Sequence, residues 1–274
     1  MTLMDAAHDP SFDALTGKIA RERGFACGSY KPTCLMRRIA VRMRARGVHG
    51  YAAYARLLDA DPAEYDRLLD ALTINVTKLR RNAEAWDALE AEALPALFAR
   101  PERTLRTWSA GCSSGEEPVT LAMSWARAAE RIGRPHDLAR VQVLGTDIDA
   151  RSLERARAGA FAESAFTEVP PGDRARWFTS GEPSVALPVL RDRITVEKRD
   201  LLEQPAPAGP WHLIACRNVI IYFDRASQDA LLARFHAALV PGGVLMLGKV
   251  ESLLGSARAL FEPLNVRERI YRKP

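Results

Sequence analysis

The chain has 274 residues, of which 47% are hydrophobic and 27% charged, the composition of an ordinary globular protein. No basic stretch followed by an apolar one begins the sequence, and no apolar run approaches the length of a membrane span. We therefore expect a cytoplasmic protein with no direct membrane insertion. The four cysteines show no CxxC pair or other metal-ligand spacing, so we expect reduced thiols and no metal site.

The formal net charge of +5 is unevenly distributed. Seven basic residues and no acidic residue lie between Lys31 and Arg56. This asymmetry indicates an acidic partner for the N-terminal part, although a solvated helix face is the ordinary alternative. Nucleic acid is a competing partner class, but no aromatic platform or nucleic-acid motif accompanies the arginines. We therefore expect no nucleic acid partner.

Residues 11 to about 90 are predicted to be helical. Leu35, Met36, Ile39 and Met43 fall on one face at helical spacing, and the arginines occupy the rest of the circumference. Arg38, Arg42 and Arg46 are four residues apart and so line up along one side. The further helices predicted in this part are 51–58, 63–72 and 83–99.

From about residue 104, predicted strands alternate with predicted helices, which is typical of an α/β fold with a doubly wound, largely parallel sheet. Residues 160–195 break this alternation with turn-rich short segments, which predicts a small inserted antiparallel β-subdomain. The predicted strands are 105–109, 141–147, 211–216 and 243–248, and the predicted helices are 118–132, 150–158 and 227–239, the last ended by the Pro-Gly-Gly at 241–243.

The stretch from Trp108 to Pro118 predicts a strand, a glycine-bearing turn and a helix start. Gly111 and Gly115 permit backbone conformations and a close ligand approach that a side chain would block. The N-terminus of a helix suits an anionic ligand group, but Glu116 and Glu117 would repel a pyrophosphate. A ligand with both a carboxylate and a positive charge, such as S-adenosylmethionine (SAM), fits better. The alternative is an ordinary junction in which the two glutamates complement the helix dipole.

Other polar residues follow predicted strands and should gather at the same edge of the sheet. Asp147 ends a strand and can accept both ribose hydroxyls of a nucleoside, although a helix cap is the alternative. Asp200 and Leu201 stand where an adenine could be bound by a side chain and a backbone amide, and a turn is the alternative for Asp200. Arg217 and Asn218, directly after another strand, are plausible ligand contacts.

Two further segments could contribute to this site. Asn75 and Thr77, followed by Arg80 and Arg81, could close over a ligand from the N-terminal side. The alternative for this segment is a capped helix start with solvated arginines. Tyr222 could present its hydroxyl to a ligand or pack in an interface.

Taken together and in order, these segments resemble the CheR-type chemoreceptor glutamate methyltransferases over nearly the whole chain. The similarity rests on five segments. They are Tyr30–Met43, Leu72–Thr77, Trp108–Pro118, Gly145–Asp149 and Cys216–Asp224.

The resemblance implies a class I SAM-dependent methyltransferase domain at 81–274, with a β-subdomain inserted at about 160–195, and a helical recognition domain at 1–80. It implies methyl transfer from SAM to glutamate side chains on the cytoplasmic helices of a chemoreceptor, with S-adenosylhomocysteine as product and no metal. A monomer is expected. By resemblance, Arg81 and Tyr222 face the transferred methyl group. The implied substrate-binding residues are Arg37, Arg38, Arg42 and Arg46. The implied cofactor-binding residues are Asn75, Thr77, Arg81, Gly111, Gly115, Glu116, Glu117, Asp147, Asp200, Leu201, Arg217 and Asn218.

Two departures from the family pattern leave alternatives open. Leu79 and Arg80 stand where the family usually has two aromatic residues, and Lys249-Val250 replaces the family's His-Ser. Both segments are expected near the methyl or substrate opening. The alternatives are a regulatory module that binds SAM or S-adenosylhomocysteine, and a methyltransferase acting on another protein or a small molecule.

Overall fold

The computed structural model describes residues 9–73 and 77–274, which form two compact units. The first unit contains the described residues before 75 together with residues 222–227, and the second contains the remaining residues. Two details differ from the predicted division at residue 80. Residues 77–80 belong to the second unit, and a short segment far along the chain belongs to the first.

The first unit is helical. Asp9 caps its first helix by accepting a hydrogen bond from the Ser11 N–H, and Asp61 caps the last by accepting one from the Glu64 N–H. In the second helix the predicted apolar face is buried at residues 35, 36 and 39, whereas Met43 is half-buried. The helices are α1 (Pro10–Arg23), α2 (Pro32–Ala45), α3 (Tyr51–Ala60) and α4 (Pro62–Leu72), with a short 3-10 helix η2 (Cys27–Ser29).

The second unit is built on a sheet with the strand order β5-β2-β1-β6-β7-β9-β8. The strands from β5 to β7 are parallel, whereas β9 and β8 are antiparallel additions that the sequence pattern did not predict. Strand β7 already begins at Leu239 and runs through the Pro-Gly-Gly that was predicted to end a helix. The strands are β1 (Leu105–Ala110), β2 (Val141–Asp147), β5 (Ile194–Lys198), β6 (Trp211–Cys216), β7 (Leu239–Leu247), β8 (Glu262–Asn265) and β9 (Ile270–Arg272).

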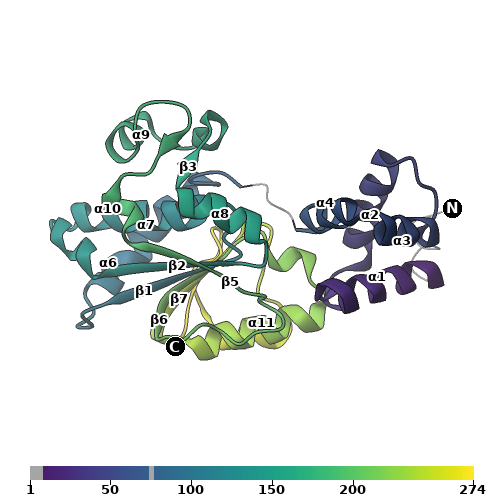
Figure 1. Ribbon diagram of the computed structural model, residues 1–274. Coiled ribbons are helices and arrows are strands. Elements are labelled where there is room, and N and C mark those ends of the chain that lie inside the picture. Colours follow the sequence, from purple (N-terminus) through teal and green to yellow (C-terminus); the bar gives the residue numbers. More distant parts are fainter. Residues whose placement is uncertain (1–8, 74–76) are drawn as a thin grey trace. The chain divides into compact units, whose positions relative to one another are not determined.

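Helices cover both faces of this sheet. Figure 1 shows α6, α7 and α8 on one face and α11 on the other. The predicted single helix 83–99 is instead α5 and α6 joined by a π-helix, η3, whose wider turn changes which side chains face the sheet. The helices are α5 (Ala83–Ala88), η3 (Leu89–Ala93), α6 (Leu94–Phe98), α7 (Glu116–Arg131), α8 (Ala150–Ala158) and α11 (Arg225–Ala238), with 3-10 helices η4 (Pro135–Arg140), η6 (Ile220–Tyr222) and η7 (Gly255–Leu260).

Residues 160–193 separate α8 from β5 and carry small elements of their own. Strands β3 and β4 pair antiparallel, with Phe161 opposite Ser184. Phe166 and Phe178 pack edge to face beneath them, with ring centroids 4.9 Å apart. The elements are β3 (Ala160–Phe161), η5 (Glu163–Phe166), α9 (Pro171–Trp177), β4 (Ser184–Val185) and α10 (Pro188–Arg191).

The register of the parallel strands aligns their carboxyl ends. Ala110 of β1 lies opposite Thr146 of β2, and Ser109 lies opposite Ala215 of β6. Two buried tryptophans fix this centre, because Trp108 donates to Thr146 Oγ1 at 2.9 Å and Trp125 of α7 donates to the Thr107 hydroxyl at 2.9 Å. The loops after β1, β2 and β6 therefore share one edge of the sheet, where parallel α/β proteins place their ligands.

Candidate active site

The loop after β1 needs glycine at two positions, for reasons of packing inside the protein. Gly111 has a φ of 87°, and a Cβ there would lie 2.5 Å from a Val219 methyl. Gly115 has a φ of 99°, and a Cβ there would lie 2.9 Å from the Ala156 Cα in α8. The prediction that these positions need glycine for their backbone conformation is confirmed by the positive φ values. The absent side chains also admit the loop after β6 and the neighbouring helix.

The first turn of α7 carries the two predicted glutamates. Glu117 accepts a hydrogen bond from the Ser109 hydroxyl at 2.7 Å. Burial raises the pKa of Glu117 to about 7, although the positive charge of Arg217 opposes the shift. Glu116 accepts from the Ser114 hydroxyl, and burial raises its pKa as well. Carboxylates with this desolvation are suited to bind a cation that restores their lost solvation.

Asp147, the last residue of β2, is 9% exposed. Its Oδ2 accepts the Ser113 N–H at 2.8 Å and its Oδ1 accepts the Asp149 N–H at 2.9 Å. Asp147 thus ties the glycine loop to its own strand, while Asp149 is the residue that caps α8. The Ile148 N–H also hydrogen-bonds to this carboxylate, which still has acceptor capacity for a ligand hydroxyl. Burial raises the pKa of Asp147 despite these backbone hydrogen bonds.

Arg217 and Asn218 follow β6. The Arg217 guanidinium stacks 4.6 Å from the centroid of the Trp86 ring and donates to the Arg81 carbonyl at 2.8 Å. Burial lowers the pKa of Arg217, and the negative charges of Glu117 and Glu251 counteract this. Asn218 adopts a left-handed φ of 60°. Within the described part of the chain, its buried Oδ1 has no hydrogen-bond partner.

Glu251 organises this edge, and sequence reasoning did not assign it a role. Its carboxylate accepts backbone N–H groups from Gly248 at 2.6 Å, Asn218 at 2.8 Å, Val219 at 2.8 Å and Ile221 at 3.3 Å. The side chain is 2% exposed. The segment 248–251 was predicted near the substrate opening, but its sequence pattern does not indicate that Glu251 accepts these N–H groups.

The remaining residues predicted to bind the cofactor lie after β5 and in the segment before α5. Asp200 follows β5 and its Oδ1 accepts the Leu202 N–H at 2.8 Å, the turn geometry that was its alternative. Leu201 is buried. Thr77 is half-buried, and Asn75 lies outside the described residues.

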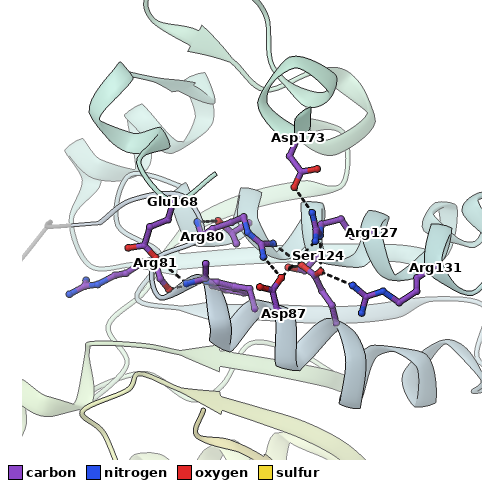
Figure 2. A network of polar contacts seen from close by, with 12 residues as sticks. Arg80, Arg81, Asp87, Ser124, Arg127, Arg131, Glu168 and Asp173 are labelled. Carbon is purple, nitrogen blue, oxygen red and sulfur yellow. Dashed lines mark hydrogen bonds and ion pairs between the residues drawn. The ribbon is translucent and has the colours of Figure 1, made fainter. Parts of the chain in front are cut away.

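Leu79 and Arg80, the departures expected near an opening, are both buried in the second unit. Leu79 is 0% exposed and its N–H donates to the Ala165 carbonyl at 3.1 Å. Arg80 enters a network of polar contacts among α5, η3 and α7, whereas Arg81 points away from that network (Figure 2). Arg80 is thus an internal residue of the second unit, whereas the side chain of Arg81 is directed away from this network.

Tyr222 belongs to the first unit. Its carbonyl accepts the Lys31 N–H at 2.9 Å, and the Arg38 guanidinium lies 5.6 Å from its ring centroid. Arg38 also donates to the Ala71 carbonyl at 2.6 Å. These contacts of Tyr222 are all made within the first unit.

The arginines predicted to bind substrate are not equivalent. Arg42 makes a two-pronged ion pair with Glu64, at 3.0 Å and 2.7 Å. Arg46 pairs with both Asp61 at 2.8 Å and Glu64 at 3.1 Å. The side that these arginines share thus faces acids of α4 and its cap, and their charges are largely neutralised internally. Arg37 is exposed.

Comparison with known proteins assigns the family. Residues 75–270 match the description "CheR methyltransferase, SAM binding domain", and residues 10–73 match "CheR methyltransferase, all-alpha domain". The chain belongs to the CheR methyltransferase family. The predicted class I α/β methyltransferase fold with a separate all-α N-terminal domain is thereby confirmed.

Relatives of this CheR chain are similar over most of its length. A chemotaxis protein methyltransferase of Listeria monocytogenes is 34% identical, covering 88% of this chain and 90% of that protein. The chemotaxis protein methyltransferase of Escherichia coli is 30% identical over 92% of this chain and 87% of that protein. An uncharacterized 104.1 kDa protein of Rhodobacter capsulatus is 36% identical over 88% of this chain, which spans only 25% of that protein.

Residues 9–73 and 77–274 contain no cluster of three or more His, Cys, Asp or Glu side chains arranged to hold a metal ion. No helix in those same ranges combines the length and the apolar character needed to cross a bilayer.

Proposed function

We propose that this chain transfers the methyl group of SAM to glutamate side chains on the cytoplasmic helices of chemoreceptors, acting in the cytoplasm. The products are glutamate methyl esters and S-adenosylhomocysteine. Family membership and the relatives named chemotaxis protein methyltransferases support this proposal. The observation that carries it is the shared edge of the sheet, to which β1, β2 and β6 bring Glu117, Asp147 and an Asn218 amide oxygen that has no hydrogen-bond partner among the described residues.

The residues at this edge fit SAM. Glu117 suits the positively charged amino group of the ligand, because a cation would replace the solvation that burial removes from the carboxylate. Asp147 still has acceptor capacity for a ribose hydroxyl beside the backbone N–H groups that it binds. The Asn218 amide oxygen needs a donor, which a ligand N–H or O–H can supply. When bound, SAM supplies an electrophilic methyl group on a sulfonium.

The chain's own residues need only align the second reactant. A glutamate side chain has a reference pKa of about 4.3, so it is already a carboxylate at neutral pH and needs no general base. We assign the alignment of this carboxylate to Arg81, through charge-assisted hydrogen bonds, and to the Tyr222 hydroxyl. Arg37, which is exposed, is the one of the four arginines predicted to bind substrate that is best able to meet acidic receptor side chains.

Two linked measurements test this function. SAM and S-adenosylhomocysteine should each raise the melting temperature, since a ligand at a hundredfold its Kd adds about 2.7 kcal/mol of stability. Radiolabelled SAM should then transfer its methyl group to receptor fragments, with the label released by base as expected for an ester. Stabilisation without transfer to any receptor would favour a binding module, and base-stable label would mean another acceptor atom.

Arg81→Ala should lower the transfer rate by about tenfold to a hundredfold, the loss expected when a reacting group is misaligned. Arg103→Ala is the matched control. Arg103 is exposed just before β1 begins, at the end of that strand opposite the glycine loop. Equal rates for wild type and Arg81→Ala would contradict the assignment of Arg81.

A further inference from the structure

Arg81 lies between two residues in the left-handed backbone region. Arg80 has a φ of 52° and Asn82 a φ of 60°. Asparagine adopts this conformation readily, but for arginine it is unfavourable and persists only where surrounding contacts impose it. The structure must therefore contain contacts that hold Arg80 in place.

Arg80 has such contacts on three of its atoms. Its side chain is 1% exposed. Nη1 donates to Glu90 Oε1 at 2.8 Å, Nη2 donates to Asp87 Oδ1 at 2.6 Å, and the backbone N–H donates to Thr120 Oγ1 at 2.9 Å. Thr120 in turn donates to the Glu116 carbonyl at 2.7 Å. The residue is thus fixed to the first turn of α7 through its backbone and to α5 and η3 through its guanidinium.

Glu90 is the centre of this anchor. It lies in the π-helix η3 and is 0% exposed. Its carboxylate also accepts the Ser124 hydroxyl at 2.9 Å and Arg127 Nε at 2.7 Å. Arg127 extends the network to Asp173 of α9 (Figure 2). Single π-turns occur often at functional sites, and this one places a fully buried acid against the residue that precedes Arg81.

The backbone of Arg81 is held from a different direction. Its carbonyl accepts Trp86 Nε1 at 3.0 Å and Arg217 Nη2 at 2.8 Å. With Arg80 anchored before it and its carbonyl doubly bonded, Arg81 has a main chain whose direction is set on both sides. In Figure 2 its side chain extends away from the Glu90 network.

We propose that Arg80 is a positioning residue that acts through Arg81. The ion pairs with the buried Glu90 and the exposed Asp87 hold Arg80 in its left-handed conformation, and this conformation directs Arg81 toward the reacting groups. The inference rests on the proposed function, because the role of Arg81 in methyl transfer is part of that function. It extends that function by assigning a positioning role to Arg80, which stands where the family usually has an aromatic residue.

Arg80→Met tests the proposal, since methionine keeps the apolar stem and removes both ion pairs. The full-length protein is assayed for methyl transfer to a receptor fragment. We expect kcat/KM to fall at least tenfold. Arg127→Met is the matched control: it removes contacts to Glu90, Asp87 and Asp173 in the same network, while the ion pairs of Arg80 itself keep both partners. Its kcat/KM should stay within twofold of wild type.

Two readouts separate positioning from a loss of structure. In an Arg81→Ala background, Arg80→Met should change kcat/KM by less than twofold, because the residue through which it acts is gone. The Trp86 indole N–H signal, assigned with Trp86→Phe, should shift in Arg80→Met and stay in place in Arg127→Met. A drop of tenfold that persists without Arg81, or an unchanged Trp86 signal, would overturn the proposal.

Failure of the proposed function is distinguishable from failure of this inference. If wild type transfers no methyl group to the receptor, the function is wrong. If wild type transfers and Arg80→Met transfers equally fast, the inference is wrong. Should Arg80→Met fail to fold, Arg80→Lys replaces it, because lysine can reach only one of the two carboxylates. The lysine variant should lose at least threefold in kcat/KM, and an unchanged rate would again overturn the inference.

Discussion

Each unit of this protein buries one glutamate among arginines, and the two clusters serve different ends. In the first unit, Glu64 accepts bonds from Arg42, Arg46 and the Tyr54 hydroxyl, and so joins the regular helices α2, α3 and α4. In the second unit, Glu90 holds a strained turn beside the candidate site. The same chemical motif therefore packs helices in one unit and sets a backbone direction in the other.

The two clusters also differ in their contact with water. Arg42 and Arg46 keep side-chain exposures of 20% and 30%. Arg80 is 1% exposed. An arginine that retains access to solvent can be rehydrated when its partner is lost, whereas a buried one is left uncompensated. The comparison therefore predicts that removing Glu90 lowers the free energy of unfolding more than removing Glu64.

The largest expected effect is that of Glu90→Ala. Removing this acid leaves Arg80 buried with only part of its pairing, so the free energy of unfolding should fall by about 3–5 kcal/mol. Urea unfolding measures the loss. Glu92→Ala, at an exposed position of the same π-helix, is the control and should cost less than about 1 kcal/mol. A loss for Glu90→Ala as small as the control would show that Asp87 alone satisfies Arg80.

Glu64→Ala should cost less, about 1–3 kcal/mol, mainly because the Tyr54 hydroxyl loses its buried partner. Burial alone would raise the pKa of Glu64, but hydrogen bonds from Arg42 and Tyr54 hold it below its usual value of 4.5. Its stabilisation is therefore fully present above that pH and lost as the pH falls through the lowered pKa.

The stability difference between wild type and Glu64→Ala, measured in urea, should shrink on going from pH 7 to pH 3. SAM affinity should not change. A difference that stays constant across this range would contradict the ion-pair origin of the effect.

Glu117→Gln should act in the opposite direction, because this acid has no arginine partner within an ion-pair distance among the described contacts. Its pKa of about 7 lies above the usual 4.5, so the wild-type carboxylate destabilises the ligand-free protein as the pH rises from 4.5 through 7. At pH 8 the glutamine variant should be more stable by about 1–2 kcal/mol, since one pKa unit corresponds to about 1.4 kcal/mol and partial exposure reduces the effect.

SAM binding provides the second readout for Glu117. We expect calorimetry at pH 8 to show about tenfold weaker SAM binding to Glu117→Gln, because an ion pair with the ligand is lost. Wild-type affinity should fall as the pH drops below about 7. Glu154→Gln, at an exposed position of α8, is the control. Stabilisation without any loss of affinity would remove Glu117 from the proposed site.

The smallest effect is expected for Arg37→Glu. An exposed charge at the rim of an interface changes binding by a few-fold, so receptor affinity should fall about threefold with an unchanged melting temperature. Arg42→Glu sharpens the contrast, because it places a second acid against Glu64 and should lower the melting temperature instead. Binding measured by surface plasmon resonance at two salt concentrations tests both. Equal melting temperatures for the two variants would contradict the internal role of Arg42.

The sequence was sufficient for features that depend on local pattern. Alternating strands and helices predicted the parallel sheet, and the polar residues after β1, β2 and β6 were predicted to share an edge because parallel strands end together. The short antiparallel β8 and β9 gave no clear periodicity. The acceptor role of Glu251 depends on four N–H groups from two loops, which no local pattern contains.

Ion pairing over long sequence distances was also beyond prediction. Glu64 lies 22 residues after Arg42, and Glu90 lies 34 residues before Ser124. The run of arginines from 37 to 46 therefore suggested an open basic surface, although Arg42 and Arg46 form ion pairs within the first unit. The π-turn at η3, which contains Glu90, interrupts the predicted α-helix 83–99, and the sequence pattern gave no signal for it.

The segment 222–227 makes the helical unit discontinuous in sequence. Tyr30 and Phe223 form a β-bridge with their rings 5.1 Å apart, and the Asp224 N–H donates to the Ser29 carbonyl. In a chimera that exchanges only the first 74 residues between relatives, the helices come from one parent and residues 222–227 from the other. The β-bridge between residues 30 and 223 would then join segments from two different proteins. A chimera that keeps the helical unit intact should therefore exchange both segments together.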